Sequence, residues 1–185
     1  MSGSYVAQSR MNSCVAACVA MVRTHLGLPT TEQDVLAEWG EPLRPRGYAT
    51  HKLETIDGIS STWLEIDNLN QQSDALLSLD MHLFEQRWVV AEVLNGPLKV
   101  FARKHGLNSK HGDLVPTYDD EASLMSKMQG YALGTHVLIV IGRTDDIYHV
   151  LDPYHGLSPQ PIDLPESWLV KMSTNQFWVC PLASE

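Results

Sequence analysis

The strongest constraint on the fold is a predicted β-hairpin in the second half of the chain. Residues 136–141 form an unbroken apolar strand, residues 142–146 have the composition of a turn, and residues 147–151 form the returning strand. In an antiparallel hairpin, the start of one strand lies beside the end of the other. His136 opens the first strand and Asp152 directly follows the second, so we expect these two side chains to be neighbours.

A second constraint lies near the N-terminus, where a polar stretch changes abruptly into an alanine-rich apolar run at Cys14. Apolar residues at three- and four-residue steps predict a helix over residues 14–26, which Gly27 ends. Asn12 or Ser13 is positioned to cap it. A thiol at a helix N-terminus faces free backbone N–H groups and the positive end of the helix dipole, and both favour the thiolate.

The remaining predicted elements mostly place helices before strands. We expect a helix over residues 32–39, capped by Thr30 or Thr31, and a mostly helical segment over 73–94. The short run 88–90 within that segment fits a strand equally well. Further predictions are strands over 62–66, 98–102 and 176–180 and helices over 121–129 and 165–172. This order predicts an α+β class.

Length and composition favour one globular domain over residues 1–185, with a helical part in about residues 1–95 and a sheet part in about residues 96–185. Hydrophobic residues make up 44% of the chain and charged residues 19%, with a net charge of −9. The negative charge argues against sequence-independent binding to nucleic acid or anionic lipid and suits a basic substrate. No apolar run has the length of a membrane span and the first residues lack a signal-peptide pattern, so we expect a soluble protein made in the cytoplasm. A domain of a longer exported protein would have the same features.

Three cysteines do not suggest a disulfide framework. Cys14 and Cys18 have no second Cys or His pair at zinc-finger spacing, so we expect no structural zinc and no cofactor. Cys18 and Cys180 are expected in the core.

The predicted hairpin and the N-terminal helix together suggest a reactive site. If the helix packs on the sheet, Cys14 joins His136 and Asp152, so that the carboxylate orients the imidazole and the imidazole receives the thiol proton. Gln8, shortly before the thiol, can donate its amide N–H to an oxyanion beside the Cys14 N–H. His149 and His155 lie near Asp152 in the sequence and are alternative bases.

These residues resemble the motifs of papain-like cysteine peptidases, especially the bacteriocin-processing peptidases that cleave after a double glycine. The similarity comprises Gln8 and Cys14 followed by Ala17 and Met21, the strand 136–140, the run 152–156 that begins with Asp-Pro and ends with Gly, and the segment 164–168. The run Asn95-Gly96-Pro97-Leu98 is similar to the Gly-Pro start of a strand in related peptidases, including bacterial effector proteases.

The resemblance implies a papain-like cysteine peptidase fold, with N-terminal helices packed on a mostly antiparallel sheet. It implies Cys14 as nucleophile, His136 as base and acid, Asp152 as the residue that orients His136, and Gln8 as hydrogen-bond donor to the oxyanion. The substrate would be a protein or peptide cut after small residues such as Gly-Gly.

The sequence also departs from the leader peptidases. Val15 stands where they usually have Gly, Ser13 stands where they often have Asp, and the interval from Cys14 to His136 is longer. A free-standing effector or toxin protease, delivered into another cell and paired with an inhibitor or immunity protein, fits these differences better.

Other functions remain open from the sequence. The same triad can serve a transglutaminase, acyltransferase or amidase, and a non-enzymatic binding module is a third possibility. Lys104, His105, Lys110 and His111 form a small basic cluster that is either a solvated loop or a loop that binds a substrate or partner.

Overall fold

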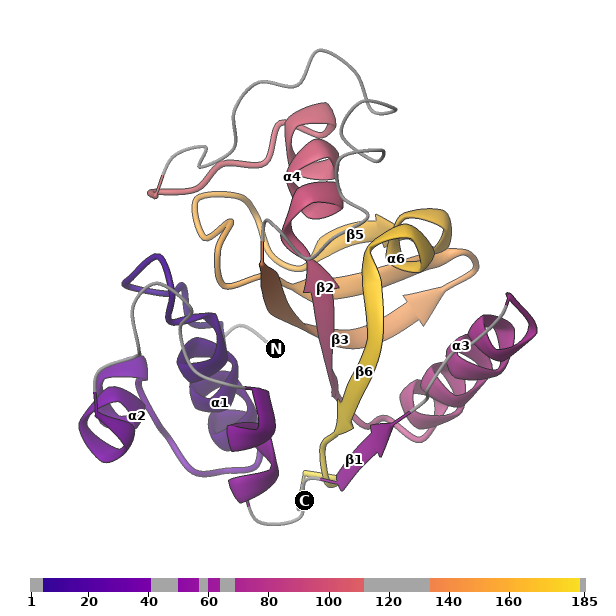
Figure 1. Cartoon of the computed structure of the whole chain (residues 1–185). Coiled ribbons are helices and arrows are strands. Elements are labelled where there is room, and N and C mark those ends of the chain that lie inside the picture. Colours follow the sequence, from indigo (N-terminus) through magenta and orange to yellow (C-terminus); the bar gives the residue numbers. More distant parts are fainter. Residues whose placement is uncertain (1–4, 41–49, 57–59, 64–68, 112–133, 184–185) are drawn as a thin grey trace.

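A six-stranded antiparallel sheet forms the centre of the protein (Figure 1). The structure, a computed structural model, describes residues 5–40, 50–56, 60–63, 69–111 and 134–183. The strand order is β1-β6-β2-β3-β4-β5. The strands are β1 (Ser60–Trp63), β2 (Val89–Leu94), β3 (Thr135–Thr144), β4 (Ile147–Leu151), β5 (Ile162–Pro165) and β6 (Ser173–Val179).

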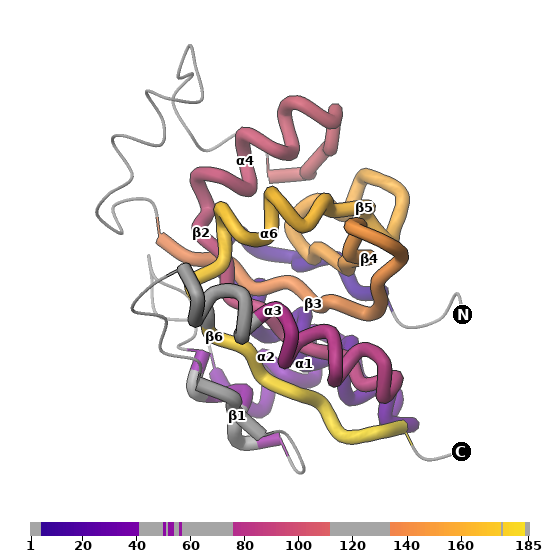
Figure 2. The backbone as a smooth tube through the Cα atoms, turned by 90° about the vertical axis from the view of Figure 1, so that its right-hand side faces the viewer, coloured from indigo at the N-terminus to yellow at the C-terminus, as the bar shows by residue number. Residues whose placement is uncertain are grey.

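Helices cover both faces of the sheet. They are α1 (Cys14–His25), α2 (Glu32–Trp39), α3 (Leu69–Phe84), α4 (Asn95–Lys104) and α6 (Glu166–Met172), with a 3₁₀-helix η1 (Thr50–Thr55). Helix α1 packs on one face with α2 and η1, whereas α3, α4 and α6 contribute to the core on the other face. Figure 2 shows α3 in front of the sheet and α1 behind it.

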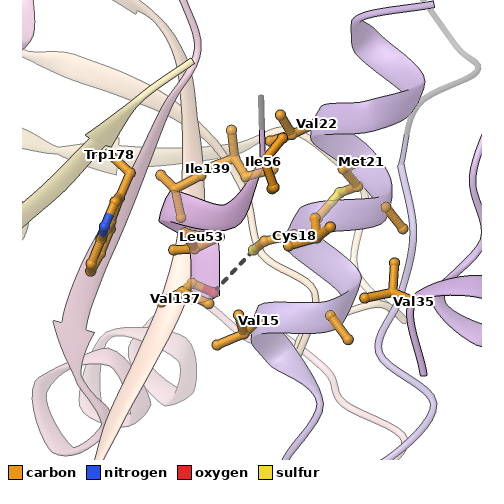
Figure 3. Close-up of a cluster of buried hydrophobic side chains, with 14 of the residues drawn as sticks. Val15, Cys18, Met21, Val22, Val35, Leu53, Ile56, Val137, Ile139 and Trp178 are labelled. Carbon is orange, nitrogen blue, oxygen red and sulfur yellow. Dashed lines mark hydrogen bonds between the residues drawn. The ribbon is translucent and has the colours of Figure 1, made fainter. Parts of the chain in front are cut away.

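The central strand β3 shows why this arrangement is stable. Its residues alternate between two cores, with Val137 and Ile139 on the α1 side and Leu138 and Val140 on the α3 side. A strand buried on both faces is apolar without interruption, which is the pattern in the sequence. Figure 3 shows the core on the α1 side, where Cys18 lies between α1 and β3. Its thiol is 3.6 Å from the carbonyl oxygen of Val137.

The α+β class and the antiparallel sheet confirm the predicted fold. The hairpin β3–β4, the helices α1 and α2 and the last strand lie within a few residues of their predicted positions. Thr31, rather than Thr30, caps α2, because its side chain accepts the N–H of Asp34 and the Asp34 carboxylate accepts the N–H of Thr31.

One predicted element is wrong. Residues 98–102 belong to helix α4 rather than to a strand. The Gly-Pro pair before this run favours a break before a strand, but proline is tolerated in the first turn of a helix, where its missing N–H would have no partner. Within the predicted segment 73–94, helix α3 confirms the helical part, and β2 (Val89–Leu94) confirms the alternative in which the end of the segment is a strand.

The sheet draws on both halves of the chain, because β1 and β2 come before residue 95. The predicted division into a helical part and a sheet part is therefore not observed. The helix predicted over 121–129 lies outside the described residues. Within the described ranges, no helix is long and apolar enough to cross a membrane.

Candidate active site

Cys14 is the first residue of α1 and is partly exposed. Burial of its surroundings acts to raise the pKa of the thiol. A hydrogen bond and the charge of His136, together with the N–H groups of Val137 and Val15, outweigh this effect, so the pKa is lowered from its usual value. The N–H of Val15 comes from the first turn of the helix, as expected for a thiol at this position.

His136 lies near the start of β3, and its side chain is buried, with 4% exposed. Its Nε2 is 2.8 Å from Oδ1 of Asp152, so Nδ1 is the ring nitrogen left to face Cys14. Burial acts to lower the pKa of His136, but Asp152 and Cys14 together raise it to about 10. A lowered thiol pKa beside a raised imidazole pKa favours a thiolate–imidazolium pair.

Asp152 follows the end of β4, and its carboxylate is buried. Besides His136, its Oδ1 accepts the backbone N–H of Tyr154 at 2.9 Å, and its Oδ2 is 2.6 Å from Nδ1 of His155. Burial acts to raise the pKa of this carboxyl, but His136 and His155 hold it well below its usual range. Asp152 is therefore an anion when the site is assembled.

Gln8 is fully buried, on a segment that lies against the residues after Asp152. Its backbone N–H donates to the carbonyl oxygen of Pro153 at 2.9 Å, and its Nε2 donates to the carbonyl oxygen of Arg10 at 2.6 Å. Its Oε1 has no hydrogen-bond partner among the described residues. The amide thus sits in the loop that leads to Cys14, and its role as oxyanion donor stays a prediction.

Residues 5–8 are held beside Asp152 by several contacts. The Tyr5 hydroxyl donates to the backbone carbonyl of Asp152 at 2.9 Å, and Nε2 of His111 is 3.2 Å from the carbonyl oxygen of Gln8. Gly156 permits this close approach, since a Cβ there would lie 2.5 Å from Cβ of Ala7. This contact gives a physical reason for a glycine shortly after Asp-Pro.

Glu32, at the start of α2, accepts hydrogen bonds from the loop before Cys14. It is 5% exposed, and its carboxylate accepts the N–H of Ser9 at 2.8 and 3.0 Å and the hydroxyl of Ser13 at 2.5 Å. Ser13 occupies the N-cap position of α1 but makes no side-chain cap hydrogen bond. Sequence reasoning missed Glu32, because an acidic residue in a first helical turn is common and carries no signal of a long-range contact.

The alternative bases occupy different surroundings. Nδ1 of His149 is 2.8 Å from Asp163, and its Nε2 is 3.0 Å from the hydroxyl of Thr144, so this ring is engaged elsewhere. His155 contacts Asp152 on the oxygen that His136 does not use. Of the predicted basic cluster, His111 contacts the segment that carries Gln8, whereas His105 lies against Phe101 of α4, 4.3 Å between ring centroids.

Among the residues that the structure describes, no group of three or more His, Cys, Asp or Glu side chains is arranged to hold a metal ion.

A solved structure with a similar fold supports the fold described above. A crystal structure of a protein from Bacillus anthracis, described as a C39-like peptidase, superposes with a TM-score of 0.54. The match covers 98% of this chain and 95% of that chain, at 13% sequence identity. No protein-family model and no curated protein matches the sequence. The chain therefore has a C39-like, papain-like peptidase fold.

Proposed function

We propose that the chain is a cysteine peptidase with Cys14 as its nucleophile. One observation carries this proposal. His136 contacts the Cys14 thiol and, through Nε2, the buried carboxylate of Asp152 at 2.8 Å. A thiol, an imidazole and an orienting carboxylate in this order are the parts that nucleophilic acyl transfer requires.

The reaction follows from these positions. The Cys14 thiolate attacks the carbonyl carbon of a peptide bond, and the carbonyl oxygen becomes an oxyanion. The His136 imidazolium gives its proton to the leaving amine, so that the C–N bond breaks and a thioester remains. His136 then takes a proton from water, which attacks the thioester, releases the carboxylic acid and restores the Cys14–His136 pair.

Gln8 is the proposed side-chain donor to the oxyanion, beside the backbone N–H of Cys14. Its amide has two N–H groups, and the hydrogen bond to the Arg10 carbonyl uses one of them. That hydrogen bond orients the amide, and the second N–H remains to donate. Removing such a donor typically lowers kcat by about 10²–10³-fold.

The proposed substrate is a protein or peptide cut after small residues such as Gly-Gly. The resemblance of the Gln8–Cys14 and His136–Gly156 segments to leader peptidases supports this preference. The departures at Ser13 and Val15 support an effector protease, made in the cytoplasm and delivered into another cell, rather than a leader peptidase. An inhibitor or immunity protein would then protect the producing cell.

Proteomics of newly formed peptide termini tests the activity. Wild type, Cys14→Ala and the control Cys180→Ala are incubated with a cell lysate, and new N-termini are identified by mass spectrometry. We expect new termini with wild type and the control and none with Cys14→Ala. Unchanged cleavage by Cys14→Ala would show the proposal to be wrong, and modified or deamidated glutamine without new termini would indicate acyl transfer or amidase activity instead.

Paired peptides test the specificity. Two synthetic peptides that differ only in Gly-Gly or Leu-Leu at a central position are compared for cleavage by wild type. We expect cleavage directly after Gly-Gly and none in the Leu-Leu peptide. Equal cleavage of both would remove the proposed preference while leaving the peptidase activity in place.

A further inference from the structure

The carboxylate of Asp152 is held at both oxygens. Oδ1 accepts from Nε2 of His136 and from the N–H of Tyr154, whereas Oδ2 is 2.6 Å from Nδ1 of His155. The torsion that rotates an aspartate carboxylate has broad, shallow minima, so donors on one oxygen alone do not fix its plane. His155 supplies the donor on the second oxygen.

His155 is itself held in place. It is 3% exposed, and its ring meets the ring of Tyr154 edge-on at 5.1 Å between centroids. Nε2 of Gln160 donates to the backbone carbonyl of His155 at 3.3 Å, and Oε1 of the same side chain accepts the N–H of Asp152 at 3.1 Å. Gln160 therefore ties together the backbones of the two residues whose side chains meet.

We propose that His155 is a positioning residue, which fixes the carboxylate of Asp152 so that Oδ1 faces His136. With Oδ1 fixed, the proton of His136 stays on Nε2 and Nδ1 faces Cys14. Loss of the His155 donor leaves a buried carboxylate oxygen without its partner and frees the carboxylate to rotate away from His136. The inference rests on the proposed function, because it assigns a role to His155 through the same three residues.

The chain contains a matched control for this contact. His149 also places Nδ1 2.8 Å from an aspartate oxygen, that of Asp163, with which it is paired across β4 and β5. That pair is largely exposed and does not include Asp152. Changing His149 alters a histidine–aspartate contact on the same hairpin without altering the carboxylate that faces His136.

The test measures the rate at which iodoacetamide alkylates Cys14 as a function of pH, so it needs no substrate. Wild type, His155→Leu, His155→Asn and His149→Leu are compared, and labelling of Cys14 is followed by peptide mass spectrometry. Asparagine places an N–H close to the position of Nδ1, whereas leucine fills a similar volume without a donor.

We expect wild-type Cys14 to react rapidly at about pH 6, where an ordinary thiol is protonated. His155→Leu should react at least about tenfold more slowly there, with a profile shifted toward that of an ordinary thiol. His155→Asn should restore most of the rate, and His149→Leu should match wild type. A merely structural role for His155 would alter melting temperature but not the pH profile of the folded protein.

Equal rates for His155→Leu and wild type would overturn the inference, and so would an equal loss in His155→Asn and His155→Leu. If wild-type Cys14 reacts no faster than an ordinary thiol, the proposed function itself fails. If His155→Leu does not fold, a ¹H–¹⁵N correlation spectrum of the histidine rings in the wild-type protein tests the inference instead, because it shows which nitrogen of His155 carries a proton. A proton on Nδ1 of His155 supports the inference, and an unprotonated Nδ1 overturns it.

Discussion

Oε1 of Glu32 lies 2.5 Å from Oγ of Ser13, the residue directly before the proposed nucleophile. The same carboxylate accepts the N–H of Ser9, so one side chain of α2 holds both ends of a short loop. Glu32→Ala should lower stability by about 1–3 kcal/mol, because the Ser9 N–H loses its partner. Activity should fall by about tenfold or more as the loop before Cys14 loosens.

Glu32→Gln keeps a hydrogen-bond acceptor, so its stability and activity should lie between those of wild type and Glu32→Ala. The control is Glu38→Ala on the same helix, which removes an exposed pair with Arg23 and should cost about 0–1 kcal/mol. Urea denaturation and peptide cleavage measure the two effects. If Glu32→Ala and Glu38→Ala lose the same stability and activity, the carboxylate of Glu32 does not stabilise the loop.

Gly156→Ala should displace residues 5–8, since the added methyl group would meet Cβ of Ala7 at 2.5 Å and the Tyr5 hydroxyl at 3.0 Å. We expect a loss of about 1–3 kcal/mol in stability and reduced cleavage, because Gln8 lies on the displaced segment. Gly142→Ala is the control, where the methyl group would meet only an ordinary contact at 3.9 Å. Equal melting temperatures for the two variants would contradict the steric argument.

His136→Gln should raise the pKa of Cys14. The effects that lower this pKa come first from His136, whereas burial, which raises it, remains in the variant. The ultraviolet absorbance of the thiolate, titrated against pH with Cys14→Ala as the blank, measures the change. His149→Gln is the matched control and should titrate like wild type. A Cys14 pKa that is the same in His136→Gln and wild type would exclude a thiolate–imidazolium pair.

Asp152→Asn should lower stability near neutral pH, and the difference from wild type should shrink as the pH falls. The native pKa of this carboxyl is lower than its unfolded value, so its contribution to stability is present above the unfolded pKa. That contribution is lost as pH falls through the native pKa, when the wild-type carboxyl also becomes neutral. Urea midpoints from neutral to acidic pH measure this, and a pH-independent difference would argue against an ionised Asp152.

The sequence predicted the parts of the site that depend on local pattern. An apolar strand, a turn and a returning strand were enough to place His136 beside Asp152, and helical periodicity was enough to place Cys14 at a helix start. Helix α4 was not predicted, and residues 98–102 were assigned to a strand, because a Gly-Pro pair disrupts a helix interior yet is tolerated in the first turn. The catalytic roles of the four predicted residues stay predictions.

Contacts between distant segments could not be predicted from the sequence. The carboxylate of Glu32 reaches the loop before Cys14 only because α2 packs beside α1. The sequence leaves His155 open as an alternative base, since proximity to Asp152 in the sequence does not show which carboxylate oxygen it contacts. Such contacts depend on the packed arrangement of elements rather than on periodicity.

The strand order has a consequence for biosynthesis. Strand β6 comes last in the chain, yet it lies between β1 and β2 in the sheet, and β2 in turn pairs with β3, which carries His136. A nascent chain on the ribosome lacks this middle strand until synthesis passes residue 179, so the surface on which α1 packs is incomplete until then. Cys14 is synthesised early, whereas His136 on β3 and the strand β6 follow much later, so we expect the thiol to meet His136 in the packed site only after residue 179 has been made.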